Sequence, residues 1–162
     1  MTLAASRQRT GPESAGSVQG WEKLAAALQY EARLMEELHA VLMRQRASVA
    51  QNDSAAIEDS VEAMGRTLYT LQTARERRLS LVRLLTGGEG RSLTDVPRLL
   101  GEPVPQMVLE AKARVQKAAS EVSREAAINQ HVIKRSLDAG EAFIQRLFSD
   151  TGSLNPDRKS VV

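Results

Sequence analysis

Three long tracts of the chain place apolar residues at alternating steps of three and four, and no proline interrupts any of them. A heptad pattern sustained over this length predicts α-helices that pack side by side along their lengths. The tracts cover about residues 19–51, 54–86 and 105–149. Aromatic residues make up only 3% of the chain, a composition that favours long helices over sheets. We therefore expect an all-α fold.

Local signals mark where these helices begin and end. Asn52 and Asp53 predict a tight hairpin, in which a short side-chain oxygen caps the first turn of the second helix. Gly87 and Gly88 end that helix, because glycine tolerates the left-handed conformation that follows a helix. Pro105 suits the first position of the third helix, since proline lacks an amide hydrogen that would be unpaired there anyway.

The remaining segments are short or polar. The connector before the third helix is expected to hold a short helix over residues 95–100, capped by Ser92 or Thr94. We expect residues 1–18 to form a disordered leader and residues 150–162 to form a flexible tail. Most side chains of both segments are small or polar, so the segments have little apolar area to bury.

Helix lengths predict the architecture of the domain, which covers residues 19–149. We expect an elongated antiparallel three-helix bundle, or coiled coil, with the short connector helix at one end. At 1.5 Å per residue the third helix would be roughly 67 Å long, against roughly 50 Å for each of the first two. In an up-down-up arrangement this C-terminal helix overhangs, and the residues after about Leu137 lie beyond the hairpin at Asn52 and Asp53.

The third tract also changes character along its length. From Val108 to Val122 its apolar seam is narrow and made of small residues, as in a bundle. From Val132 onward the helix carries two adjacent apolar stripes and is broadly apolar. This face predicts a surface that binds another protein chain. Its candidate partner-binding residues are Val132, Ile133, Leu137, Phe143, Ile144 and Leu147.

Signals of chemistry are absent from the sequence. The chain has no cysteine and two histidines, with no glycine-rich phosphate loop and no metal-ligand spacing. We expect no enzymatic activity, no metal and no cofactor. The sequence also holds no apolar leader and no run of 18 uncharged apolar residues, so we expect a cytoplasmic protein without membrane insertion.

The charge balance does not favour a nucleic-acid partner. The chain has 22 basic and 20 acidic residues, which interleave to give a net charge of +2. The densest basic cluster consists of Arg75, Arg77, Arg78 and Arg83, interrupted by Glu76. We interpret it as a solvated helix face, because nucleic-acid binding would need a continuous basic stripe.

One short string allows a signalling alternative. His131, Lys134 and Ser136 resemble the His-x-x-Lys-Gly-x core of histidine phosphotransfer domains, in which an exposed imidazole accepts a phosphoryl group. Arg135 stands where that family has glycine. The alternative interpretation of His131 is an ordinary surface histidine.

Two segments of the chain together follow a recognisable pattern. One segment is a leucine-rich helix with a glutamate and an arginine near its middle, and the other follows the pattern Asn-x-x-apolar-apolar-x-x-Ser-Leu. The residues of the first segment are Leu68, Leu71, Glu76, Arg77, Leu81, Leu84 and Leu85, and those of the second are Asn129, Val132, Ile133, Ser136 and Leu137. In this combination the two segments resemble the FlgN family of flagellar export chaperones.

The resemblance implies a function for the overhanging helix. It implies a cytoplasmic chaperone that binds the C-terminal segment of hook-filament junction proteins (hook-associated proteins) through its C-terminal half. Such a chaperone prevents aggregation and delivers its substrates to the type III export apparatus. The tail lacks the tyrosine that follows the last helix in much of that family. A homomeric coiled-coil structural protein, with the apolar face as its self-association seam, is the remaining alternative.

Overall fold

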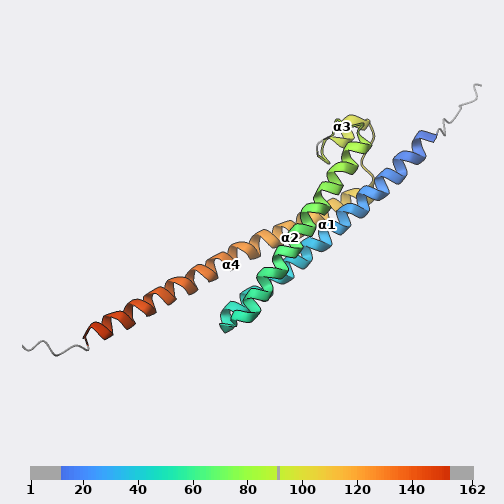
Figure 1. The fold of residues 1–162 in the computed structure, drawn as a ribbon. Helices are drawn as coiled ribbons and strands as arrows, with labels where there is room; N and C mark the ends of the chain where they lie inside the picture. Colours follow the sequence, from blue (N-terminus) through green and yellow to red (C-terminus); the bar gives the residue numbers. More distant parts are fainter. Residues whose placement is uncertain (1–11, 91, 154–162) are drawn as a thin grey trace, which may run out of the picture.

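The computed structural model describes the backbone of residues 12–90 and 92–153, and the side chains of residues 18–90 and 92–146. Within these ranges the chain is all-α and has no strand. Its four helices are α1 (Pro12–Gln51), α2 (Ser54–Leu85), α3 (Val96–Leu100) and α4 (Gln106–Ser153) (Figure 1). The expected fold class, an elongated helical bundle with a short connector helix, is confirmed.

The first and last helices of the chain are both longer than the sequence predicted. α1 begins at Pro12, so the expected disordered leader is wrong for residues 12–18, and residues 1–11 lie outside the described part. α4 continues to Ser153, so the expected flexible tail is helical over residues 150–153, and residues 154–162 lie outside. Neither segment contains a proline after Pro12, and their polar side chains do not prevent a helix from continuing.

The hairpin between α1 and α2 forms where Asn52 and Asp53 predicted it. Asn52 adopts a left-handed backbone conformation with φ of 54°, which asparagine tolerates better than most residues. Asp53 caps α2, and its Oδ1 accepts a hydrogen bond of 3.0 Å from the amide of Ala56. The same two residues therefore reverse the chain and cap the start of the second helix.

A buried ion pair joins α1 and α2. Glu31 is only 2% exposed, and its carboxylate accepts from Arg78 Nε at 2.6 Å and from Arg78 Nη2 at 3.4 Å. The prediction that Arg78 belongs to a solvated basic face is therefore wrong, whereas Arg75, Arg77 and Arg83 are exposed as expected. A buried pair of this kind favours one register of the two helices, because any slippage would leave both charges unpaired.

The face that α2 turns toward the core differs from the predicted seam. Three of its four buried residues are small or polar, namely Ser60, Thr67 and Ala74, and the fourth is Val82, which the heptad spacing also predicts to be buried. By contrast, the heptad spacing of this tract predicts Val61, Leu68 and Leu84 on the seam, but they are 50%, 46% and 78% exposed, so this prediction is wrong. The large side chains of α1 occupy the space between these helices, and small residues opposite them let the helices approach.

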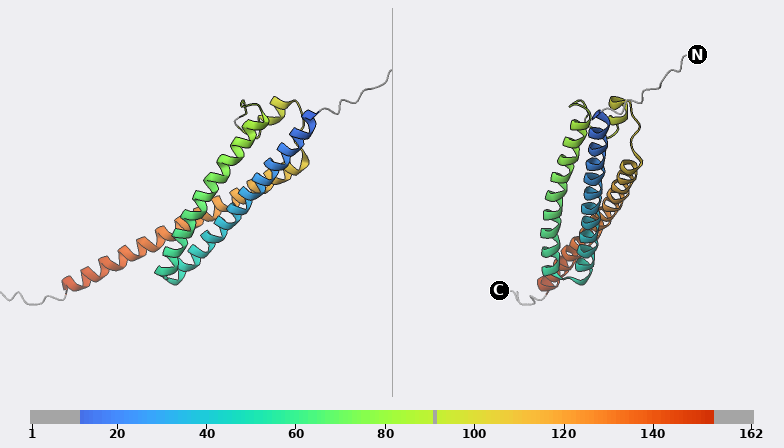
Figure 2. Two further views of the ribbon diagram at one scale, coloured as in Figure 1. Left: turned by 45° about the vertical axis from the view of Figure 1, so that its right-hand side comes forward. Right: turned by 90° about the vertical axis from the view of Figure 1, so that its right-hand side faces the viewer.

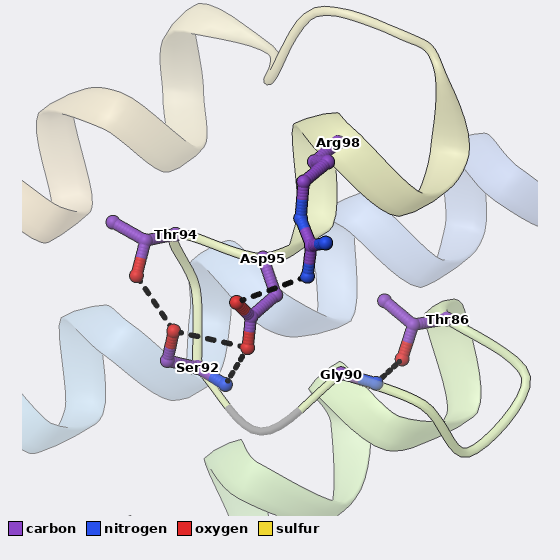
Figure 3. A network of polar contacts seen from close by, with 6 residues as sticks. All are labelled: Thr86, Gly90, Ser92, Thr94, Asp95 and Arg98. Carbon is purple, nitrogen blue, oxygen red and sulfur yellow. Dashed lines mark hydrogen bonds and ion pairs between the residues drawn. The ribbon is translucent and has the colours of Figure 1, made fainter.

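Figure 3 shows how polar contacts order the connector between α2 and α4. Thr86 Oγ1 accepts from the amide of Gly90 at 2.8 Å, and a Cβ atom at Gly90 would lie only 2.5 Å from that oxygen. The expected cap of α3 is corrected: Asp95 is the N-cap, and its carboxylate accepts from the amide of Ser92 at 2.9 Å. Ser92 and Thr94 instead share a hydrogen bond of 2.6 Å between their hydroxyls.

The connector brings the chain back so that α4 packs on α1. Pro105 precedes α4 rather than opening it, and its carbonyl accepts from the amides of Val108 and Leu109. The apolar core lies at this end of the molecule, where α1, the end of α2, the connector and the start of α4 meet. Its buried members are Trp21, Leu24, Ala25, Leu28, Val82, Leu93, Val96, Val108 and Ala111.

α1 is the central helix of the fold. It packs extensively against both α2 and α4, and among the described residues no interface of similar extent joins α2 to α4. Figure 2 shows α1 between the other two long helices. α4 crosses α1 at an angle, so its C-terminal part runs away from the α1–α2 hairpin instead of continuing along the hairpin axis (Figure 1).

Removing the arginine of the buried ion pair tests whether it holds the α1–α2 hairpin. Arg78→Ala is expected to lower the free energy of unfolding by about 3 kcal/mol, because it leaves the Glu31 carboxylate buried without its partner. Urea unfolding followed by circular dichroism measures this loss. Arg75→Ala, on the exposed side of the same helix, should change the free energy by no more than about 0.5 kcal/mol. Equal effects of the two substitutions would contradict the assignment.

Candidate functional site: the C-terminal face of α4

The candidate site continues the stripe by which α4 packs on α1. Val108, Ala111 and Ala118 are buried in this stripe, and Val115 and Val122 are half-buried. Residues spaced by three and four along a helix share one face, so the stripe runs on through residues 125, 129, 133, 137, 140 and 144. The first half of the stripe has a partner helix, and the second half is the site.

Two buried polar residues mark the boundary between these halves. Asn129, 4% exposed, donates from Nδ2 to the carbonyl of Leu42 at 2.7 Å and to Gln45 Oε1 at 3.2 Å. Among the described residues these are the last hydrogen bonds that join α4 to α1, and they form before α1 ends at Gln51. Asn129 Oδ1 is buried without a hydrogen-bond partner. The apolar packing of α4 on α1 therefore gives way to polar contacts at this point.

Glu125 lies one turn earlier and is also 4% exposed. Its Oε1 lies 2.8 Å from Arg46 Nη1, but the two atoms are not aligned for a hydrogen bond, so this oxygen has none. His39 Nε2 is 4.0 Å from the other carboxylate oxygen. The pair is thus an ion pair of imperfect geometry at the edge of the interface, and such pairs add little net stability.

A second ion pair between α1 and α4 lies nearer the core. Arg114 Nε and Nη2 donate to the two carboxylate oxygens of Glu36 at 2.8 and 2.7 Å, a bidentate arrangement. These hydrogen bonds lower the pKa of Glu36 below its ordinary value. The stabilisation is therefore present above the ordinary pKa of a glutamate and is lost as the pH falls through the lowered value. Both side chains are nearly half exposed, so the effect on stability is small.

Beyond the polar boundary the described side chains of α4 become exposed. Val132 is half-buried, and every described side chain from Ile133 to Arg146 is exposed. Figure 1 shows this part of α4 running clear of the other helices. The predicted overhang is thus present, although it points away from the hairpin instead of lying beyond its end.

The structure places five of the six predicted partner-binding side chains on this free part of the helix. Ile133, Leu137 and Ile144 are 37%, 64% and 52% exposed and continue the α1-facing stripe. Val132 and Phe143 lie next to that stripe by their spacing, and Phe143 is 62% exposed. Leu147 belongs to α4, but its side chain lies outside the described residues. No contact tests the binding role of these residues, which stays a prediction.

Sequence reasoning did not assign a structural role to the polar boundary. Glu125 and Asn129 occupy positions at which the heptad seam would continue after Val122. The boundary could therefore have been predicted, because two polar residues at successive seam positions indicate where a helix stops packing on its neighbour. In the sequence, Asn129 is notable only as part of the family resemblance.

Other kinds of site find no support in the part of the chain that the structure describes. No group of three or more histidine, cysteine, aspartate or glutamate side chains comes together there to hold a metal ion. Within the same residues no helix has the length and apolar character required to cross a membrane. Comparisons of the chain with protein-family models, with curated proteins and with solved structures find no match.

Truncating the boundary asparagine tests how α4 is attached to α1. Asn129→Ala should lower the free energy of unfolding by about 1 to 3 kcal/mol, because it removes both hydrogen bonds and leaves buried polar groups of α1 unpaired. Urea unfolding followed by circular dichroism is the measurement. Gln130→Ala, at the exposed neighbouring position, is the matched control and should have almost no effect. If both variants unfold like the wild type, Asn129 does not hold the two helices together.

Proposed function

We propose that the protein binds an amphipathic helical segment of a partner protein on the C-terminal face of α4. A single observation carries the proposal. The stripe that packs on α1 continues past Asn129 as exposed apolar side chains, among them Leu137 and Ile144, which are 64% and 52% exposed. Contiguous apolar surface of this kind is typical of protein-binding sites. An isolated exposed leucine would not support the same conclusion.

Continuity of the stripe favours a helix as the occupant. Over its first half the stripe already packs on a helix, α1, and apolar or small residues continue along this side of α4 at steps of three or four through Ile144. Gly140 lies within the stripe, and a Cβ atom built there meets nothing within 4 Å. A helix laid along α4 past the end of the α1 contact would therefore find the same ridges and a point of close approach.

The exposed apolar side chains of α4 provide enough surface to bind a partner helix with about micromolar affinity. Burying each large side chain contributes roughly 1.5 to 3 kcal/mol before the costs of association and ordering. Three or four such anchors reach about micromolar affinity after those costs. This range suits a protein that holds its partner temporarily.

The resemblance to the FlgN family suggests which partner this is. We propose a cytoplasmic chaperone that binds the C-terminal segment of hook-filament junction proteins, prevents their aggregation and passes them to the flagellar type III export apparatus. The residues that carry the resemblance include Asn129, at the boundary, and Ile133 and Leu137, on the exposed stripe. The proposal thus rests on the resemblance together with an exposed face at the matching positions.

Carboxylates placed on the stripe should abolish this binding. We expect Leu137→Asp with Ile144→Asp to weaken binding of the C-terminal peptide of a hook-filament junction protein by at least about 100-fold. The reason is that both anchors are lost and two charges are placed in an apolar contact. Isothermal titration calorimetry measures the affinity, and circular dichroism confirms that the variant is folded.

The matched control adds two carboxylates to the opposite side of the helix. Ala127→Asp with Ala142→Asp changes two exposed residues away from the stripe and should keep the affinity within about twofold. Undiminished affinity in the folded stripe variant would exclude the site. No binding by the wild type at high micromolar concentration would remove the chaperone assignment. A mass that rises with concentration, and falls in the stripe variant, would replace it with the homomeric coiled coil.

The phosphotransfer alternative keeps one supporting observation, because His131 is exposed on a long helix as a phosphoryl acceptor must be. If the chaperone proposal is right, His131→Gln should leave peptide affinity unchanged within about twofold, because the imidazole merely flanks the stripe. The measurement is calorimetry beside an assay of acid-labile phosphate after incubation with a histidine kinase. Transfer of phosphate to the wild type, but not to the variant, would put the signalling function first.

A further inference from the structure

A second surface lies on the α1–α2 hairpin and is independent of the proposed function. Two shallow depressions of about 220 and 310 Å³ run between α1 and α2, and they meet at Tyr30, which lines both. No residue of α4 lines either depression. We call the two together the hairpin groove. It extends along α1 from Lys23 to Arg44, roughly 30 Å at 1.5 Å per residue.

The hairpin groove concentrates positive charge. Its ionisable lining consists of five cations and one carboxylate, whereas the whole chain has 22 basic and 20 acidic residues. The carboxylate is Glu37. The cations are Lys23, Arg33 and Arg44 from α1 and Arg66 and Arg77 from α2. An excess of this size on one strip of a nearly neutral protein attracts acidic partners.

Most of these cations are unpaired within the described residues. Arg66 forms an ion pair with Glu62 at 2.6 Å, but Lys23, Arg44 and Arg77 have no carboxylate within ion-pair distance there. The guanidinium of Arg33 lies over the ring of Tyr30, 5.8 Å from its centroid, a contact that keeps the charge beside the groove. The groove therefore offers donors that a ligand can use without breaking existing pairs.

We infer that the hairpin groove binds an acidic helical segment of a partner protein. Two packed antiparallel helices leave a straight groove into which a third helix fits. The floor between the cations includes Ala26, Ala27 and Ala74, whose small side chains let a helix backbone approach closely. Charge complementarity then favours glutamate or aspartate along the facing side of that helix.

Glu37 favours a peptide over a nucleic acid. It lies within the groove and would repel a continuous phosphate backbone, whereas a peptide helix can place a lysine or arginine opposite it. Tyr30 is the only aromatic residue of the groove, so there is no series of rings on which bases could stack. Residues 1–11 and 154–162 do not match such a segment, because residues 1–11 carry two arginines and no carboxylate side chain, and residues 154–162 carry one aspartate beside Arg158 and Lys159.

Charge reversal within and outside the groove tests the inference. The groove variant is Lys23→Glu with Arg77→Glu, and the control is Arg75→Glu with Arg124→Glu, which makes the same change in net charge at exposed positions outside the lining. The probe is a fluorescein-labelled peptide of roughly 20 residues with glutamate on one helical face and alanine elsewhere. A peptide of the same composition in scrambled order and a single-stranded oligonucleotide of equal charge are measured beside it by fluorescence anisotropy.

The groove variant should bind the patterned peptide about tenfold more weakly than the wild type, and the control should differ by less than about twofold. Affinity for the wild type should fall between about 50 mM and 300 mM salt, as the attraction is screened. The double variant Leu137→Asp with Ile144→Asp should leave the affinity for the patterned peptide unchanged. A negative result for the hairpin groove can therefore be told apart from a negative result for the α4 site. Equal losses in both charge variants, equal binding of the scrambled peptide, or tighter binding of the oligonucleotide would each overturn the inference.

Discussion

The whole fold depends on the packing of α1 against both of the other long helices. Because α2 and α4 share no comparable interface among the described residues, α1 is the main packing neighbour of each. Apolar seams of this kind tolerate slippage by a turn, and buried polar pairs are what favour one register. Glu31 and Arg78 serve this purpose between α1 and α2. Asn129, with Leu42 and Gln45, serves it between α1 and α4.

An open arrangement around one central helix leaves surfaces that a closed bundle would fill. The C-terminal half of α4 presents apolar side chains, and the hairpin groove presents cations over small residues. These surfaces suit different tasks, because burial of apolar area provides affinity, whereas complementary charge mainly increases the rate and selectivity of association. The two proposed ligands would therefore not compete, since the groove and the α4 stripe have no residue in common.

Periodicity predicted the helices and the seam of α1 because that seam is built from large apolar residues. The heptad spacing of the first tract predicts Trp21, Leu28 and Leu42 on its seam, and all three are buried. The same rule failed for α2, where Thr67 is buried and Leu68 is 46% exposed. A heptad count assumes that the largest residues face inward, but the space between two helices is shared. Where large side chains of α1 already fill the space between the two helices, small residues of α2 fit better. The sequence of one helix alone does not show how that space is shared between the two.

The candidate site was predictable for a related reason. Its apolar stripe is longer than the neighbouring helices can cover, and a comparison of the three helix lengths is enough to show this. The direction of the overhang could not be predicted from the sequence, because it depends on the angle at which α4 crosses α1. From Ile133 to Arg146 the side chains of α4 are exposed, and helices without tertiary packing are marginal in water. A partner helix would supply the missing packing. Part of the binding free energy would then go into ordering α4, which keeps the complex weak enough to be released.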